Sequence, residues 1–586
     1  MIFLLVLGLA APSPWATRCA PCHGSEGRGD GVAAHLYWPQ PANLIDAPLK
    51  LSRDTGEMAD IIRRGIPGTG MPAFGAHLDD ETIEQLVTWI NQRRSTMSPA
   101  THPEVIVEPF DSEAARGRAV ELGKEAWLTQ GCVGCHAGGN EMKQNLKNDD
   151  GTPADLYSLF EQPLKKGDDL QSIVRAISEG RPGSPMGTYA HLSMETRRGL
   201  AAWILHNRRH ITTAPRVPPQ GYTPTRHRTF LWPKTPIVTE SPGDLPVLRR
   251  PLAARCGRCH PKQHEQWTQS RHGLAGGVGV EGQYIGESLA WIGQCTRCHS
   301  PLADQQPTQP VSSIDPSERR GGAAAFRAEG VTCAACHLRP DGKIAANASE
   351  GKASHVMQPR EVPAMGRSEM CMPCHNLPLS VAVEGRPLLD TWREWAASPY
   401  MAAGVQCQHC HMPQGDHRWL GAHDPATVAQ SVEVEISTSQ VGGAINATID
   451  VSNVGAGHWW PTTATPRGVL RVRLLTAGGE IVEGTEKTWA VGRTMRFSKG
   501  QWRTVADTRI PPGERRQWRY HQALGEGAVT LEAELWFFPD WFYGRFFSKR
   551  RDDPDPGRQA AFTSAWQEAS GRRFRIVHRR LSILEL

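Results

Sequence analysis

All fourteen cysteines of this chain belong to one pattern, Cys-x-x-Cys-His, which occurs seven times in 586 residues. The pattern is typical of covalent haem c attachment, in which two thiols bond to the porphyrin and the adjacent histidine ligates its iron. A zinc ribbon would not require a histidine after every cysteine pair, and a disulfide scaffold would not require the same short gap seven times. We therefore expect seven covalently attached c-type haems. The motifs are Cys19-Cys22-His23, Cys132-Cys135-His136, Cys256-Cys259-His260, Cys295-Cys298-His299, Cys333-Cys336-His337, Cys371-Cys374-His375 and Cys407-Cys410-His411.

Length and charge narrow the remaining possibilities. A chain of 586 residues is longer than a single hydrophobic core usually supports, so we expect several domains. The net charge of +5 is too weak to indicate a nucleic-acid partner. The expected partners are other redox proteins or a membrane respiratory complex.

Residues 1–16 contain the apolar run MIFLLVLGLAA, followed by Pro12 and Pro14. The run predicts a secretory signal peptide, or a short N-terminal membrane anchor if it is not cleaved, and it is too short to span a bilayer comfortably. Haem c attachment is completed outside the bacterial cytoplasm, which independently predicts export. The expected location is the periplasm or the outer face of the cytoplasmic membrane, with the extracellular surface as an alternative.

The first two motifs lie in a duplicated segment. Cys19 and Cys132 are 113 positions apart, and the Ala-His-Leu sequence of residues 76–78 recurs at residues 190–192. A nearly constant offset over several features indicates an internal repeat. The two expected domains are residues 17–100 and residues 101–210.

Each copy resembles a class I monohaem cytochrome c, a small all-α domain. Each has an opening Cys-x-x-Cys-His motif, a methionine in a Gly/Pro-rich loop and a closing helix. In that family the methionine is the distal iron ligand, so the resemblance implies Met71 in the first copy and Met186 in the second. A thioether ligand raises the reduction potential of the iron. The alternative is that both are ordinary core methionines. His77 and His191 also recur and are interpreted as structural or surface residues.

Residues 211–250 are rich in proline and arginine and predict a linker. Beyond it, five motifs recur every 36 to 39 residues, which leaves too little protein to enclose each haem separately. The porphyrins must therefore pack against one another in a mostly helical and irregular domain, residues 251–429. The region resembles the superfamily of pentahaem nitrite reductases, octahaem oxidoreductases and tetrahaem cytochromes, through Ser270-Arg271-His272 after the third motif and Trp392 and Trp395 before the seventh.

In that superfamily a second histidine commonly ligates each iron from the distal side. The resemblance implies five such ligands for the five haems, and their pairing with individual haems stays open. His264 follows its own motif closely and His409 lies between two tethered cysteines, so both are interpreted as non-ligands. The alternative for His458 is a histidine in a surface loop. The candidates are His272, His355, His417, His423 and His458.

The remaining segment, residues 430–586, contains no cysteine and alternates apolar with polar residues over several runs. One such run is Ile445, Ala447, Ile449 and Val451, and the pattern predicts a β-sandwich of Ig-like kind. Leu535 to Phe547 is unusually aromatic. It is interpreted as a strand with a packed corner, the alternative being a docking patch for a membrane complex or another partner.

These features predict an electron relay between a chain of bis-histidine haems and two haems with histidine and methionine ligands. The first alternative is an oxidoreductase that reduces or oxidises a small nitrogen or sulfur compound at an open haem. No Cys-x-x-Cys-Lys motif or other odd motif favours it, and no catalytic residue is predicted. The second alternative is a haem-wired subunit of a larger respiratory complex. Whether the protein is an enzyme is left open, with electron transfer preferred.

Overall fold

The computed structural model describes residues 12–208 and 253–583, except for residues 13, 38, 48, 50, 52, 53, 67, 68, 95–105, 137–145, 149–153, 155–158, 161–163, 166, 182, 183, 313–321, 338–364, 378–380, 499 and 526. The predicted linker, His355 and most of the predicted signal segment lie outside the described residues. The chain divides into two units, one holding the described residues up to 208 and the other holding most of those from 253 onward. In the described part of the chain, no helix is both long and apolar enough to cross a membrane.

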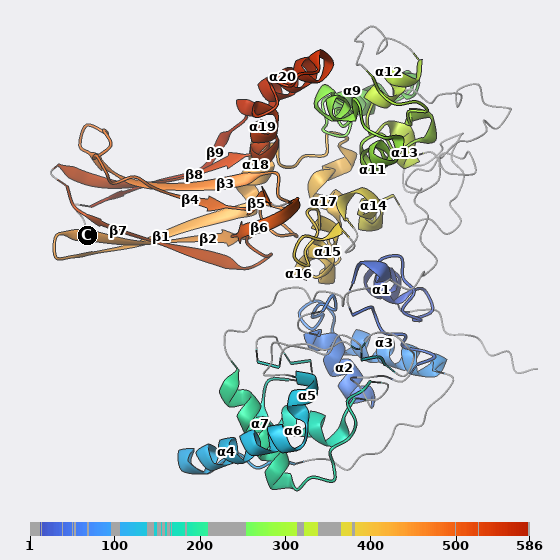
Figure 1. Ribbon diagram of the computed structural model, residues 1–586, viewed down its shortest axis with the longest axis vertical. Helices are drawn as coiled ribbons and strands as arrows, with labels where there is room; N and C mark the ends of the chain where they lie inside the picture. Colours follow the sequence, from blue (N-terminus) through green and yellow to red (C-terminus); the bar gives the residue numbers. More distant parts are fainter. Residues whose placement is uncertain are drawn as a thin grey trace, which may run out of the picture. The chain divides into compact units, whose positions relative to one another are not determined.

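The first unit is helical and contains both copies of the repeat (Figure 1). The first copy consists of η1 (Trp15–Cys19), α1 (Ala20–His23), η2 (Ala34–Leu36), α2 (Thr55–Arg64) and α3 (Asp80–Arg93). The second consists of α4 (Glu113–Thr129), α5 (Cys132–His136), α6 (Leu170–Glu179) and α7 (Met194–Asn207).

Corresponding helices of the two copies begin and end in the same way. The side chain of Asp54 accepts a hydrogen bond from a backbone N–H in the first turn of α2, and Asp169 does the same for α6. Gly65 ends α2 with φ +67°, and Gly180 ends α6 with φ +66°. The left-handed backbone at these ends favours glycine. The repeat therefore extends from the sequence to the local structure.

The second copy is held together by a close helix crossing. α4 packs on α7 at Gly123 and Gly199, where a Cβ on Gly123 would lie 1.9 Å from the carbonyl oxygen of Gly199. Trp127 and Leu200 are buried beside this crossing. In the first copy, Trp15 of η1 is buried against Trp89 of α3, with ring centroids 4.4 Å apart.

The haem-motif part of the second unit is built from short helices. They are α8 (Ala253–Gly257), α9 (Pro261–Thr268), α10 (Val278–Glu281), η5 (Gly282–Tyr284), α11 (Leu289–His299), η6 (Ala303–Gln305), α12 (Gly322–Ala328), α13 (Cys333–His337), η8 (Ser368–Met370), α14 (Met372–His375), α15 (Thr391–Ala396), α16 (Pro399–Ala402), α17 (Cys407–His411), η10 (Pro413–Gly415) and α18 (Pro425–Ser431). Helices of one to three turns gain little stability alone. They fit the expectation that prosthetic groups supply much of this core.

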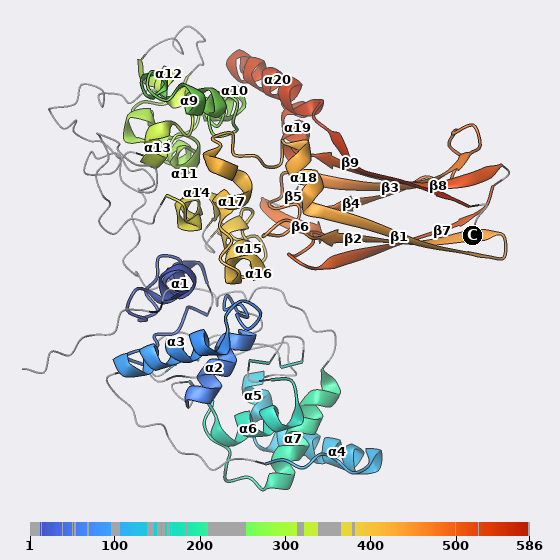
Figure 2. The same ribbon diagram turned by 180° about the vertical axis from the view of Figure 1, so that it is seen from behind.

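The predicted β region is confirmed. One antiparallel sheet has the order β1 (Val432–Val441), β2 (Ala444–Asn453), β7 (Arg515–Ala523), and a second has the order β4 (Lys487–Val491), β3 (Arg467–Thr476), β8 (Ala528–Phe538), β9 (Phe574–Ser582). β5 (Arg493–Ser498) and β6 (Gln501–Asp507) form a separate hairpin. Figure 2 shows the two larger sheets face to face.

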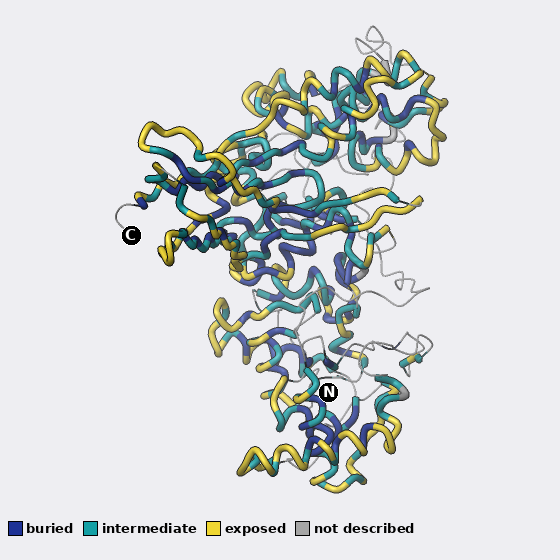
Figure 3. Tube along the Cα trace, turned by 60° about the vertical axis from the view of Figure 1, so that its left-hand side comes forward, coloured by how far each residue is buried: buried dark blue, intermediate teal, exposed yellow. Residues whose placement is uncertain are grey.

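The inward residues of the two sheets share one hydrophobic core. Ile445 and Ile449 of β2 and Leu470 and Leu535 of the facing sheet are fully buried, as the predicted alternation requires. Buried and partly buried positions alternate along β2 and most of β3, whereas Leu531–Leu535 of β8 are buried without a break. Figure 3 shows the burial along the chain trace. The assignment to an Ig-like fold stays a prediction.

The aromatic segment Leu535–Phe547 comprises the end of β8 and most of α19 (Trp541–Ser548), which packs on α20 (Pro556–Ser570). Phe547 is buried against Phe562, with ring centroids 5.8 Å apart. α20 also lies against α10, where a Cβ on Gly279 would be 2.8 Å from the side chain of Ala565. The segment is thus a strand with a packed corner, and this corner joins the β region to the haem-motif region.

Gly123→Ala should destabilise the second copy, because the added carbon would collide with the carbonyl oxygen of Gly199. We expect a loss of about 1–3 kcal/mol, the usual cost of overpacking. Gly117 lies on the same helix with nothing within 4 Å of such a carbon, so Gly117→Ala should be neutral or stabilising by up to about 1 kcal/mol. Thermal unfolding of the haem-loaded protein would measure both changes, and equal effects would contradict the close crossing.

Candidate haem sites

Each Cys-x-x-Cys-His motif lies in or beside a short helical turn. Residues three and four apart share one face of a helix, so the two thiols and the imidazole of one motif point toward the same side. None of the fourteen cysteines forms a disulfide. This arrangement suits covalent attachment of one planar group per motif.

Several motif histidines are oriented by a backbone carbonyl. The Nδ1 atom of His23 lies 3.1 Å from the oxygen of Ala42, and that of His299 lies 2.9 Å from the oxygen of Ala275. His411 Nδ1 is hydrogen-bonded to the oxygen of a residue after its own motif. An Nδ1–H that donates to a carbonyl leaves Nε2 with its lone pair free to bind a metal.

Burial lowers the pKa of several motif histidines and so favours their neutral form. It lowers the pKa of His375 to about 4, assisted by the nearby His411 and His458. Burial, with the charge of Arg181, also lowers the pKa of His136 to about 4. A metal binds the deprotonated ring nitrogen, so these environments favour ligation.

The predicted distal methionine of the first copy lies in a hydrogen-bonded loop. Ile66 N donates to the oxygen of Met71 at 3.0 Å, and the Thr69 hydroxyl donates to the oxygen of Ile66 at 2.7 Å. The same hydroxyl accepts from Met71 N at 3.1 Å. The backbone at Met71 is therefore fixed from both sides.

The second copy repeats this loop bond for bond. Arg181 N donates to the oxygen of Met186 at 2.9 Å, the Ser184 hydroxyl donates to the oxygen of Arg181 at 2.7 Å, and Met186 N donates to that hydroxyl at 3.3 Å. The matched bonds extend the repeat to both methionine loops, and the assignment of both methionines as ligands stays a prediction.

Three pairs of histidine rings in the second unit share one separation. The ring centroids of His272 and His375 are 6.1 Å apart, those of His337 and His417 are 6.2 Å apart, and those of His411 and His458 are 6.2 Å apart. Iron–nitrogen bonds of about 2 Å, with about 1.2 Å from each nitrogen to its ring centre, would separate two axial imidazoles by about 6.4 Å. Each pair joins a motif histidine to a predicted distal histidine, so these residues fit a haem iron between them.

His272 is held in place by the Ser-Arg-His segment predicted from sequence. The Ser270 hydroxyl donates to the oxygen of Trp267 at 2.7 Å and accepts from Gly273 N at 3.0 Å. Burial lowers the pKa of His272 to about 3, with further lowering by His375 and His411. This histidine is therefore neutral in the folded protein over the physiological pH range.

Sequence reasoning missed Trp419, which lies between two predicted distal ligands. Its ring centroid is 4.6 Å from that of His272 and 5.2 Å from that of His417, edge-on to both. Trp419 has φ +49°, a conformation that a bulky side chain rarely adopts. No motif signal could have identified it, because its role depends on two histidines that are distant in sequence.

Two of the five predicted distal ligands are not among the three histidine pairs. The Nε2 atom of His423 lies 3.0 Å from both carboxylate oxygens of Asp540, and His355 lies outside the described residues. The motif histidines His260 and His299 are likewise outside these three pairs. The ring of His409, a predicted non-ligand, accepts a hydrogen bond from Gln406 N at 3.2 Å.

Thiols of different motifs contact one another. Cys256 is hydrogen-bonded to Cys333, which lowers the pKa of Cys256 to about 7 and raises that of Cys333. The same contact joins Cys298 to Cys374 and Cys371 to Cys407. These contacts bring the attachment edges of neighbouring sites together.

A cluster of Glu532, Glu534 and His578 has the composition of a metal site, but arginines neutralise it. Glu532 lies 2.7 Å from Arg473, and Glu534 lies 2.6 Å from Arg575. Although burial raises the pKa of Glu532, hydrogen bonds from His578 and the neighbouring arginines lower it to about 2. The cluster is an ion-pair network across the second sheet.

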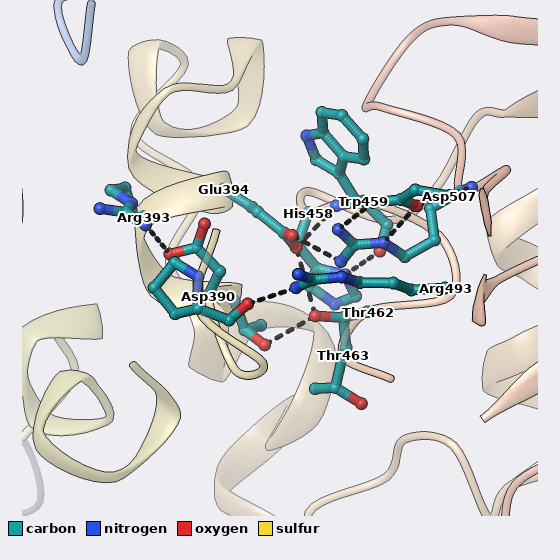
Figure 4. Close-up of polar contacts among 12 residues, drawn as sticks. Asp390, Arg393, Glu394, His458, Trp459, Thr462, Thr463, Arg493 and Asp507 are labelled. Atoms are coloured by element: carbon teal, nitrogen blue, oxygen red, sulfur yellow. Dashed lines mark hydrogen bonds and ion pairs between the residues drawn. The ribbon is translucent and has the colours of Figure 1, made fainter. Parts of the chain in front are cut away.

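The loop that carries His458 is fixed to the haem-motif region by polar contacts (Figure 4). The Nδ1 atom of His458 lies 3.0 Å from the oxygen of Trp459, and Trp459 N donates to the Glu394 carboxylate at 3.2 Å. Asn453 donates to the oxygen of His458 at 2.9 Å. His458 is partly buried and its ring faces that of His411, which favours the prediction of a ligand over the surface-loop alternative.

Parts of the chain are similar to known proteins. Residues 12–90 match the family described as cytochrome c oxidase, cbb3-type, subunit III. The chain is similar to a penta-haem cytochrome c552 from Thermochromatium tepidum, with 20% identity, a TM-score of 0.42, and coverage of 57% of this chain and 99% of that one. It is also similar to the reducing HAO-like protein complex of Kuenenia stuttgartiensis, with 21% identity, a TM-score of 0.30, and coverage of 33% and 94%. The comparison with curated proteins found no match.

The family match and the repeated motif support a c-type cytochrome. More particularly, they support a multihaem c-type cytochrome with covalently bound haem, acting in electron transfer or haem-based redox chemistry.

Met71→His and Met186→His should each lower the reduction potential of one haem. The expected change is on the order of 0.1–0.3 V, a fraction of the about 0.8 V that axial ligands span, because imidazole favours ferric iron more than a thioether does. Met58 is a buried methionine of α2 outside the loop, so Met58→Leu is the control and should leave every potential unchanged. Spectroelectrochemical titration would measure the potentials, and unchanged values in both histidine variants would mean that these methionines are not ligands.

Proposed function

We propose that this protein is a heptahaem c-type cytochrome that relays electrons between redox partners. The observation that carries the proposal is the common 6.1–6.2 Å separation of three histidine pairs. An iron with two protein ligands has no free position for a substrate, so such sites transfer electrons rather than bind small molecules. The protein's part is to hold the haems close together and to set their potentials.

Five ligand pairs are proposed, three from the histidine contacts described above and two from the matched methionine loops of the repeat. Two haems have histidine and methionine ligands, and three have two histidines. The pairs are His23 with Met71, His136 with Met186, His375 with His272, His337 with His417, and His411 with His458.

The thiol contacts support an order for the five sites of the second unit. The third site is next to the fifth through Cys256 and Cys333. The sixth site is next to the fourth through Cys374 and Cys298, and next to the seventh through Cys371 and Cys407. The charge of Cys336, in the fifth site, also raises the pKa of Cys371 and Cys374. The sixth site, Cys371 to His375, is therefore the proposed junction through which electrons pass among all five.

The two methionine-ligated sites supply the high-potential part of the proposed relay. They belong to the first unit, and the bis-histidine sites belong to the second. We propose that the protein is exported and exchanges electrons with another redox protein or a membrane respiratory complex. A function as a haem-wired subunit of such a complex would use the same relay.

His272→Ala, His417→Ala and His458→Ala should each convert one haem from low-spin to high-spin, because each removes one proposed axial ligand. EPR of the fully oxidised, haem-loaded protein would count the high-spin haems. His409→Ala is the control, because the ring of His409 caps a helix turn, and it should convert none. If all four variants gave the same spectrum as the parent protein, the proposed pairing would be wrong.

A second candidate function is redox catalysis on a small nitrogen or sulfur compound at the fourth site, Cys295 to His299. It is favoured by the position of His423, whose Nε2 atom is engaged by Asp540, so that one fewer distal ligand is available than the sequence predicts. The position of Tyr284 also favours this second candidate function. Its side chain is 1% exposed, and its hydroxyl has no hydrogen-bond partner among the described residues. Burial raises the pKa of Tyr284, and the charge of Cys295 raises it further, so the phenol keeps its proton next to this site.

In this second candidate, the parent protein has about one high-spin haem that binds cyanide. Tyr284→Phe should weaken binding of a ligand that accepts a hydrogen bond by roughly tenfold, the equivalent of one lost hydrogen bond. His423→Ala should leave the number of low-spin haems unchanged. Titration of the EPR and absorption spectra with cyanide would decide, since seven low-spin haems in the parent protein and the loss of one in His423→Ala would exclude the open site.

A further inference from the structure

A buried ion pair connects the haem-motif region to the β region beside His458. The Nη1 atom of Arg509 lies 2.9 Å from the Oε1 atom of Glu394, and the two side chains are 1% and 5% exposed. Glu394 belongs to α15, and Arg509 follows β6. Sequence reasoning did not identify this pair.

Glu394 holds the residues that follow His458. Its second carboxylate oxygen accepts hydrogen bonds from Trp459 N and from the Thr462 hydroxyl, each at 3.2 Å (Figure 4). That hydroxyl is also 2.7 Å from the hydroxyl of Thr391, the first residue of α15. One carboxylate therefore fixes both ends of the segment 459–462 to the haem-motif region.

Arg509 holds the same segment from the opposite side. Asp507 accepts two hydrogen bonds from its guanidinium, at 2.8 and 2.9 Å, which fixes the plane of that group. The guanidinium carbon lies 5.1 Å from the ring centroid of Trp459. The next residue, Ile510, exchanges two backbone hydrogen bonds of 2.8 Å with Trp460.

A buried ion pair adds little net stability to a contact between two surfaces, because both charges lose their hydration. Well-packed apolar side chains would stabilise the contact as much or more. The ion pair instead specifies the relative orientation of the two surfaces, because its hydrogen bonds are satisfied in one geometry only. Here that geometry determines where His458 lies. The rings of His458 and His411 are within 11° of parallel, and the Nδ1 contact with Trp459 fixes the orientation of the His458 ring.

We infer that Glu394 and Arg509 are positioning residues that hold His458 at the seventh haem site. Through them, ligation at that site depends on contact between the haem-motif region and the β region. The inference rests on the proposed function, in which His458 is the distal ligand opposite His411. Neither positioning residue touches the iron, and both act through the backbone and ring of Trp459.

The experiment compares Glu394→Gln, Arg509→Lys and His458→Ala in the full, haem-loaded chain. Glu394→Gln keeps the size of the side chain but removes the charge that fixes Arg509. We expect a roughly tenfold fall in the ratio of six-coordinate to five-coordinate iron at one site, within the range over which two coupled sites commonly act on each other. Arg509→Lys keeps the charge and should give a smaller change. EPR spectra would show a shifted low-spin signal and a new high-spin signal from one haem only.

Arg473→Gln is the matched control. It breaks an ion pair of the same β region, between partly buried Arg473 and buried Glu532 at 2.7 Å, away from the His458 loop. It should lower the thermal stability without changing the spectrum of any haem. If Glu394→Gln changed stability alone, as Arg473→Gln does, the positioning role would be wrong while the electron relay stood. If His458→Ala changed no haem, the proposed ligand itself would be wrong, whatever the Glu394 variant did.

Discussion

The separation between paired imidazoles is the constraint on which the second unit depends. In three pairs the distance varies by only 0.1 Å, whereas the angle between the ring planes is 11°, 18° and 71°. Rings that pack directly on each other couple distance to angle, because stacked and edge-on contacts have different preferred separations. A constant distance with free rotation is what a metal between two nitrogens would impose. The surrounding chain must then bring residues that are far apart in sequence to this one spacing, while the ring planes follow from local hydrogen bonds such as that of His458 to Trp459.

This constraint explains the irregular fold around the five motifs. Short helices cannot stabilise themselves, so side-chain bonds to the backbone hold the loops between them. The indole of Trp267 donates to the oxygen of Val331 at 2.9 Å, and that of Trp395 donates to the oxygen of Val405 at 2.9 Å. The β region has the opposite organisation, with a continuous apolar core between two sheets. It is therefore a rigid support from which a ligand for the seventh site can be presented.

The sequence predicted those features of the fold that depend on short-range residue patterns. The motifs, the repeat, the alternation in β2 and the ends of the methionine loops follow from short-range rules, and the contacts of Met71 and Met186 agree with them. The pairing of distal histidines could not be predicted, because any of five candidates satisfies the same local chemistry and only the tertiary fold selects among them. For the same reason Glu394 and Arg509 carry no signal: each is an ordinary charged residue until the fold buries them together. His423 has the composition of a ligand, yet Asp540 lies at its Nε2 atom.

The two kinds of proposed haem site differ in what their coordination depends on. His23 and Met71 belong to one small copy of the repeat, whose loop is closed by its own hydrogen bonds, so that site requires only the folding of its own domain. The seventh site takes its motif histidine from α17 and its second histidine from the loop between β2 and β3. Its coordination therefore requires two structural regions and the buried charges between them. In the proposed relay, a local opening of this contact would act on one iron and leave the two methionine-ligated sites as they are, so the seventh site would couple conformation to redox chemistry.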